Sequence, residues 1–216
     1  MAIPAASAPR PYHHGNLRQA LLEAALAMAQ ELGPERVSVR EAARRLGVSP
    51  AAPFRHFPNR RALMTALAEE AATRLRVEVR RHPGSQGGDP LRRLRAIGHG
   101  YLGWAGRHAA HFRIVSARDE IDIEGSAALR QEIKDLRDLT EQALADAQAA
   151  GRVGRGASVP ALALLARATV YGLARMRLDG HFAQWDVEPE RVSQAMAGTL
   201  DLLVDLMAGG TPGDVP

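Results

Sequence analysis

The sequence predicts an all-α fold, and three observations carry this prediction. Ala, Leu, Arg and Glu, which favour helices, dominate the 216 residues, whereas aromatic residues make up only 4%. Gly and Pro lie mostly between apolar blocks, and apolar residues within the blocks recur at helical spacing. No alternating run of Val, Ile, Thr and Tyr has the length of a strand.

The first two expected helices have clear starts and stops. Asn16 and Gln19 form a capping-box pattern at the start of the first helix, which Gly-Pro at 33–34 ends. The segment Ser-Val-Arg-Glu at 38–41 repeats the pattern and opens a short second helix that ends at Gly47.

Two more helices are expected directly after this turn. Ser-Pro at 49–50 predicts a hydroxyl cap and a first-turn proline for a short third helix, from which Phe54 and Phe57 face inward. Pro-Asn at 58–59 ends that helix and caps a fourth, which begins near Arg60 and carries apolar residues at helical spacing.

A linker-like stretch at 82–90 precedes the remaining helices. An acidic loop at 119–125 and a glycine-rich break at 151–156 separate them. The expected helical segments, the first of them capped by Asp89-Pro90, cover 91–104, 110–115, 126–150, 160–179 and 190–208.

Composition excludes several classes of protein. The chain is 46% hydrophobic and 24% charged, as is typical of a soluble protein, and it contains no cysteine for disulfides, thiolate zinc sites or nucleophiles. No run approaches the ~18 apolar residues of a membrane span. The first eleven residues hold three prolines and no secretory core. We therefore expect a cytoplasmic protein.

The positive charge is concentrated in the first third of the chain. Residues 1–80 hold 12 Arg and 7 Glu, net +5, whereas the remainder holds 16 basic and 17 acidic residues, net −1. Of the 28 Lys and Arg residues, 27 are Arg, whose planar fork binds phosphate oxygens in pairs. This distribution suggests a head that binds polyanions. An Arg-rich codon bias explains it equally well.

Two short capped helices joined by a glycine-containing turn are the pattern of a helix-turn-helix. Ala43 supplies the small residue that a close helix crossing needs, and Gly47 supplies a residue that tolerates positive φ four positions later. Val48 fills the gap behind the turn. On DNA, the second helix of such a unit enters the major groove and the first crosses the backbone. A plain helical hairpin fits the same spacing.

Residues 12–67 resemble the DNA-binding domain of the TetR (tetracycline-repressor-like) family of transcriptional regulators. The resemblance rests on the long first helix, the segment SVREAARRLGVS, the aromatic-x-His-Phe signature at 54–57, and Asn-Arg-Arg-x-Leu at 59–63. The rest of the chain is similar only in architecture, together with Tyr-Gly-Leu at 171–173. The implied parts are a disordered arm at 1–11, a helix-turn-helix domain at 12–65 with three helices, an effector-binding and dimerisation domain at 66–208 joined to it through helix four, and a disordered tail at 209–216.

The resemblance implies roles for residues around the turn. The residues implied to contact DNA are Ser38, Arg40, Ser49, Ala51, Arg55, His56 and Arg60. Phe54 stands where Tyr is usual and loses a hydroxyl, so we do not count it as a contact. Pro53 removes a backbone donor and is expected to distort the recognition helix. Few long polar side chains are then available to contact base edges directly, so we expect Arg40, Arg55 and DNA shape to carry more of the specificity. Tyr12 and the two His residues after it either lie against DNA or belong to the unstructured arm.

The resemblance also implies an effector pocket and a homodimer. Candidates for the pocket, each of which also fits core or dimer surface, are Tyr101, Trp104, His108, Phe112, Arg167, Tyr171, Arg175 and Met176. The residues expected at a dimer interface on the last two helices are Ala161, Ala168, Gly172, Ala195, Gly198, Leu200, Leu203 and Leu206. Two heads are needed about 34–36 Å apart to read half-sites one turn apart on a palindromic operator.

The expected function is therefore a regulator, a repressor released by a small molecule, with no enzymatic activity, cofactor, metal or membrane partner. An alternative is a ligand carrier or protein-interaction module whose basic head binds polyanions without regard to sequence. A metal-assisted hydrolase is the third hypothesis, since His108-x-x-His111 precedes the acidic loop. The glycine-rich 151–156 segment follows a helix and lacks the Gly-Lys-Ser/Thr ending of a phosphate loop. Effector, operator and the sign of regulation are not specified by the sequence.

Overall fold

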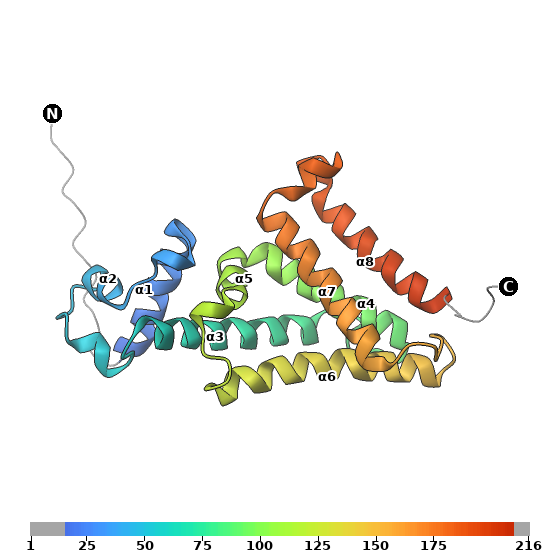
Figure 1. The fold of residues 1–216 in the computed structure, drawn as a ribbon, viewed down its shortest axis with the longest axis horizontal. Coiled ribbons are helices and arrows are strands. Elements are labelled where there is room, and N and C mark those ends of the chain that lie inside the picture. The colour runs from blue at the N-terminus through green and yellow to red at the C-terminus, as the bar shows by residue number, and fades with distance from the viewer. Residues whose placement is uncertain (1–15, 210–216) are drawn as a thin grey trace.

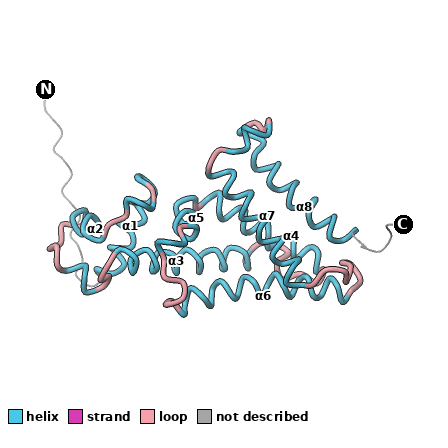
Figure 2. The backbone as a smooth tube through the Cα atoms, in the orientation of Figure 1, coloured by secondary structure: helices cyan, strands magenta, loops and turns pink. Residues whose placement is uncertain are grey.

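The computed structural model describes residues 16–209, and within that range the chain forms eight α-helices, short 3-10 turns and no strand (Figures 1 and 2). The all-α prediction is confirmed. The expected arm at 1–11, the adjoining Tyr12, His13 and His14, and the tail beyond residue 209 lie outside the described residues. The helices are α1 Leu17–Leu32, α2 Val39–Arg45, α3 Arg60–Arg81, α4 Pro90–Arg107, α5 Ala109–Ser116, α6 Ala127–Ala149, α7 Val159–Leu178 and α8 Val192–Gly209.

The helices form a small N-terminal unit, residues 16–59, beside a larger helical body, residues 60–209. Figure 1 shows α1 and α2 at one end, with α3 running from them along the body, α6 beside it, and α7 and α8 rising from the opposite side. The stretch at 82–90 reverses the chain, so that α4 packs back against α3. In the described range no helix is both long and apolar enough to cross a bilayer.

Both expected capping boxes form only half of their bonds. Asn16 accepts from the backbone N–H of Gln19 at 3.2 Å, but the Gln19 side chain donates to Glu23 instead of returning to the cap. Ser38 likewise accepts from the N–H of Glu41 at 3.5 Å. The Glu41 carboxylate is held by arginines of the same helix, because an ion pair one turn away outcompetes a return to the backbone.

The third helix is not an α-helix. The chain after the turn forms only a four-residue 3-10 segment, η2 Ala52–Arg55, and the Ser49 side chain makes no capping bond to it. Pro53 has no N–H to donate to the Ser49 carbonyl four residues earlier, and that carbonyl instead accepts from Ala52 at 3.1 Å. The expected distortion at Pro53 is confirmed. Phe57 is buried as predicted, but the inward position predicted for Phe54 is wrong, since its residue is 38% exposed.

One close helix crossing explains a wrong dimer prediction. Leu200 of α8 is buried at 2% exposure within the protomer, where it packs onto Gly98 of α4. A Cβ at Gly98 would lie 2.6 Å from a Leu200 methyl carbon, so the helices could not approach this closely with any larger residue. Leu200 therefore belongs to the core of the body and not to an exposed interface.

Two buried clusters hold the fold together. One fills the body, and the other lies under the N-terminal unit and extends along α3 to Ala72. The second cluster also takes in Ile114 of α5, Ile121, and Leu129 of α6, all almost fully buried. The N-terminal unit thus shares a continuous apolar core with the near end of the body, and the core extends beyond the domain boundary predicted at 65–66.

Candidate nucleic-acid interface and ligand cavity

The turn between α2 and η2 has the geometry that a helix-turn-helix requires. Ala43 is 1% exposed at the helix crossing, and Gly47 adopts a φ of 66°, in the left-handed region that favours glycine. The Val48 N–H then donates to the Ala43 carbonyl at 3.2 Å, which closes the end of α2. The predicted roles of Ala43 and Gly47 in the turn agree with this geometry, and the side-chain packing predicted for Val48 stays a prediction.

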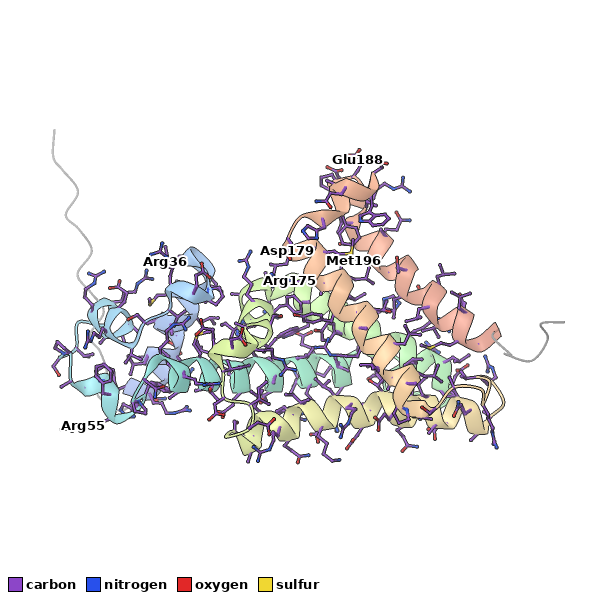
Figure 3. All side chains as sticks on the ribbon, in the orientation of Figure 1. Arg36, Arg55, Arg175, Asp179, Glu188 and Met196 are labelled. Atoms are coloured by element: carbon purple, nitrogen blue, oxygen red, sulfur yellow. The ribbon has the colours of Figure 1, made fainter. Side chains whose placement is uncertain are left out.

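Most of the residues predicted to contact DNA around this turn are open to solvent. The exposed members of the predicted set are Arg40, Ser49, Ala51, Arg55 and His56, while Ser38 is half-buried at the start of α2. Figure 3 places Arg55 at the outer end of the N-terminal unit, away from the body. A basic, exposed end of this kind can meet a nucleic-acid backbone without rearrangement of the core.

Ion pairing divides the arginines of this unit into two groups. Glu41 pairs with Arg44 at 2.7 Å and with Arg45 at 3.4 Å, and the Arg44 hydrogen bond is the largest cause that lowers the pKa of Glu41 from 4.5 to about 2. Arg40 and Arg55, by contrast, have no ion pair with any described residue. Their charge is available to an external anion.

Arg60 contacts the protein itself rather than solvent alone. At the first residue of α3, its guanidinium donates to the carbonyls of Val37 and Pro34, each at 2.8 Å. It also pairs with Glu120, 60 residues further along the chain. Arg60 therefore joins the N-terminal unit, α3 and the segment between α5 and α6, which we call the junction loop, residues 117–126.

The junction loop is pinned along the first turns of α3. The Thr65 hydroxyl donates to the Arg61 carbonyl at 2.8 Å and accepts from the N–H of Asp122 at 2.9 Å. Ser126, the cap of α6, donates to Glu69 at 2.6 Å. Any shift of the junction loop therefore also displaces the first turns of α3, the helix that follows the N-terminal unit directly in the chain.

The body contains a cavity of about 720 Å³ between α3, α4, α6, α7 and α8. Its lining is mainly apolar, with Leu75 and Val79 from α3 and Leu136 from α6 among its walls. Two junction-loop residues, Arg118 and Ile121, also line it. Size, apolar walls and a few polar groups are the features of a small-molecule site.

A second hollow of about 520 Å³ lies between α3, α4, α7 and α8 and is more polar. Among its charged lining residues Arg107 pairs with Glu78 at 2.5 Å, and Arg177 donates to the Ser193 hydroxyl at 3.1 Å. Its lining contains fewer apolar groups than that of the larger cavity. The larger, apolar cavity is the better candidate for a ligand site.

Comparison with known proteins agrees with this architecture. Residues 21–67 match the family model described as bacterial regulatory proteins, tetR family, and residues 94–200 match the one described as tetracyclin repressor-like, C-terminal domain. The chain belongs to the TetR family. Tetracycline repressor protein class C of Escherichia coli is 43% identical over 56 residues, so the match spans 26% of that curated relative and 26% of this chain.

Two solved structures extend the likeness of this TetR-family chain over nearly its whole length. A protein of unknown function from Rhodococcus sp. RHA1 is 30% identical, with a TM-score of 0.75 over 93% of this chain and 100% of that one. A regulatory protein of the tetR family from Rhodococcus RHA1 is 16% identical, with a TM-score of 0.69 over 89% of this chain and 97% of that one. The second likeness concerns the fold alone.

Only part of the predicted effector set reaches the cavity of this TetR-family protein. Tyr101, Arg167 and Tyr171 line it. The predicted residues that do not line it are Trp104, His108, Phe112, Arg175 and Met176. Trp104 and Phe112 are core residues at 0% and 1% exposure, and Arg175 turns to Asp179 at 2.7 Å. The predictions for these five residues are not supported by the cavity.

Sequence reasoning missed the wall that α6 contributes. Ile133, Leu136, Arg137, Thr140 and Glu141 all line the cavity. Their spacing of three and four residues is the signal that would have placed them on one helix face.

The two histidines considered for a hydrolytic site lie close together but lack the further ligands. His108 and His111 have ring centroids 5.7 Å apart, and His111 is 4% exposed. Across residues 16–209 no three His, Cys, Asp or Glu side chains are grouped so that they could hold a metal ion. Glu120 of the acidic loop pairs with Arg60 instead.

Proposed function

We propose that this TetR-family chain is a sequence-specific DNA-binding transcriptional regulator, and a repressor whose affinity for its operator falls when a small molecule binds. The observation that carries the proposal is the helix-turn-helix whose exposed end presents Arg40 and Arg55 with no ion pair among the described residues. Because bacterial DNA lies in the cytoplasm, the proposal places the protein there.

Base reading in this proposal differs from that of an ordinary recognition helix. The 3-10 segment η2 offers one turn rather than several, so Ser49, Ala51, Arg55 and His56 reach the groove from a short, proline-braced loop. Few side chains can then contact base edges directly. The shape and deformability of the operator carry more of the discrimination than in a reader with a full helix.

Dimerisation is proposed to use the exposed faces of α7 and α8. Leu164 at 69%, Leu202 at 58% and Leu206 at 64% exposure are large apolar residues in contact with water in the single protomer. Large apolar side chains exposed in this way are typical of an interaction site. On the same helices a Cβ at Gly172 or Gly198 would meet no atom within 4 Å, which leaves room for a partner helix.

The effector is proposed to act through the junction loop. Arg118 and Ile121 line the cavity, while Glu120 between them holds Arg60 of α3. A ligand that binds more tightly to one position of this loop shifts the population of the N-terminal unit toward the matching position, because hydrogen bonds and an ion pair join the loop to that unit. Operator affinity then depends on occupancy of the cavity.

The test is selection of duplexes from a random library on the full chain, followed by binding at two salt concentrations. The proposal predicts a palindrome with half-sites about one helical turn apart and a measurable salt slope. If no motif emerges and affinity follows salt alone, the alternative holds, namely a helical ligand carrier or interaction module with a non-specific polyanion-binding head. An Arg40→Ala variant that keeps full affinity for the selected duplex would also contradict the proposal.

A further inference from the structure

The charges around the large cavity are unbalanced. Its charged lining consists of Arg118, Arg137, Arg167 and Glu141. The one acid, Glu141, faces Arg137 at 3.8 Å. Arg118 and Arg167 have no carboxylate partner anywhere in residues 16–209. Two guanidinium groups therefore face a mainly apolar cavity without a counter-ion from the described chain.

The Arg167 side chain is positioned by two aromatic rings and keeps unused hydrogen-bond donors. Its guanidinium carbon lies 4.9 Å from the Tyr101 ring centroid and 5.0 Å from that of Tyr171, so it is stacked against two aromatic rings. One of its N–H groups donates to the Tyr101 hydroxyl at 2.8 Å. No other hydrogen bond of this side chain is made within the described range, which leaves most of its planar fork unused.

Arg118 lines the same cavity from the junction loop. Burial raises the pKa of the Tyr101 hydroxyl, and the positive charges of Arg167 and, more weakly, Arg118 act against this rise. Both arginines are exposed residues that line the cavity, so they lie where it opens to solvent, whereas Tyr101 is buried between them and the apolar walls. The buried part of the lining is therefore apolar apart from Tyr101, and all the arginines that line the cavity lie in its exposed part, beside apolar residues such as Ile133 and Leu164.

We infer that the effector is an amphipathic carboxylate: an apolar body enclosed by the cavity and one anionic head held at the mouth by Arg167 and Arg118. The inference rests on the proposed function only in taking this cavity as the effector site. A carboxylate matches the free fork of Arg167 with two parallel hydrogen bonds, and it neutralises two like charges that otherwise repel. A cavity of about 720 Å³ accepts an apolar body of drug-like size.

The position of the head group also gives ligand binding a direct effect on the N-terminal unit. Arg118 lies two residues before Glu120, the partner of Arg60. An anion that draws Arg118 toward Arg167 pulls on the short 3-10 turn, Arg118–Glu120, that carries both side chains. A neutral ligand of the same shape fills the cavity but exerts no such pull.

The test is titration calorimetry of the full chain with dodecanoate and 9-anthracenecarboxylate, each compared with its neutral methyl ester. We expect at least one acid to bind about tenfold or more tightly than its ester, because charge-assisted hydrogen bonds carry the difference. Arg167→Met, which keeps much of the apolar stem, should reduce that preference to near unity, and Arg118→Gln should weaken it. Arg155→Gln is the matched control, because this exposed arginine does not line the cavity, and it should retain the preference.

Equal binding of acid and ester, binding of neither probe pair, or an unchanged preference in Arg167→Met would overturn the inference. These results need no DNA, so they separate the ligand class from the proposed function. Failure of the ligand-free protein to bind DNA with sequence specificity would overturn the proposed function and leave the ligand class unaffected.

Discussion

Arg60 offers a test of whether a residue that the TetR resemblance assigns to DNA is instead part of the protein's internal framework. Arg60→Ala removes two hydrogen bonds from a charged donor to the carbonyls of Pro34 and Val37, and an ion pair to Glu120. We expect the variant to lose stability and to keep its phosphate contacts. The opposite result is expected for Arg55→Ala, whose side chain is exposed and forms no ion pair with a described residue.

The size of the Arg60 effect follows from these contacts. A hydrogen bond from a charged group contributes ~1.5–3 kcal/mol when buried. The Arg60 side chain is 30% exposed and its ion pair is shared with solvent, so the pair adds at most ~1 kcal/mol. Fully buried, the two hydrogen bonds would sum to ~3–6 kcal/mol, and the exposure of the side chain reduces this by about a third. We therefore expect a total loss of about 2–5 kcal/mol in the free energy of unfolding, which in a chain of this length lowers Tm by about 4–20 °C.

Thermal melting and DNA binding across a salt series distinguish the two roles. Each phosphate contact contributes ~0.9 to the slope of log affinity against log salt for duplex DNA. Arg55→Ala removes one contact from each protomer of the dimer, so it should reduce the slope by about two and leave Tm nearly unchanged, since surface substitutions cost less than ~0.5 kcal/mol. Arg60→Ala, measured well below its Tm, should leave the slope intact.

Should Arg60→Ala not fold, Glu120→Gln supplies a milder perturbation of the same contact. It removes only the ion pair, and we expect a loss below ~1 kcal/mol without a change of slope. The reasoning is refuted if Arg60→Ala keeps the wild-type Tm and reduces the salt slope of the dimer by about two, because Arg60 would then contact phosphate and not the protein.

Three further predictions follow from burial and packing. Gly98→Ala should lower the free energy of unfolding, measured in urea, by about 1–2 kcal/mol, because its Cβ overlaps Leu200. Gly103→Ala on the same helix meets only a flexible arginine tip and should raise that free energy by ~0.5 kcal/mol or more. Equal effects of the two substitutions would contradict the close crossing at Gly98. Burial lowers the pKa of His111 below 6.5, so the unfolded chain binds the proton more readily and stability should fall as pH drops below 6.5. His111→Gln should flatten that fall in Tm between pH 8 and 5.5, and an unchanged fall would show that other groups cause it. Leu206→Glu on the exposed face of α8 should weaken self-association about tenfold or more by sedimentation, and an unaltered dimer would place the interface elsewhere.

Local chemistry made most of the fold predictable. Helix starts at Asn16, Ser38 and Asp89 follow from side-chain oxygens that accept a backbone N–H, and these are visible in the sequence because they act over two or three residues. The break at Pro53 was predictable for the same reason, since a missing donor acts four residues away. The capping boxes failed because a stronger side-chain partner stood nearby, as Arg44 does for Glu41.

What the sequence did not reveal depends on contacts between distant residues. The pairing of Arg60 with Glu120 spans 60 positions, and the sequence around either residue contains no signal that identifies its partner. The cavity was predicted only in part, because a helix face such as that of α6 lines a cavity only where other helices face it across an open space, and the sequence does not specify that arrangement. Leu200 looked like interface and proved to be core for the same reason, since its partner at Gly98 lies on another helix.

The most direct test of DNA reading compares the selected duplex with a scrambled duplex of the same composition, by fluorescence anisotropy of the full chain at several salt concentrations. The account predicts that the selected duplex binds at least about 10³-fold more tightly at physiological salt, as specific readers do. It also predicts that Arg55→Ala reduces the salt slope on both duplexes by a similar amount. Equal affinity for the two duplexes at every salt concentration would contradict the account, because the head would then recognise only negative charge.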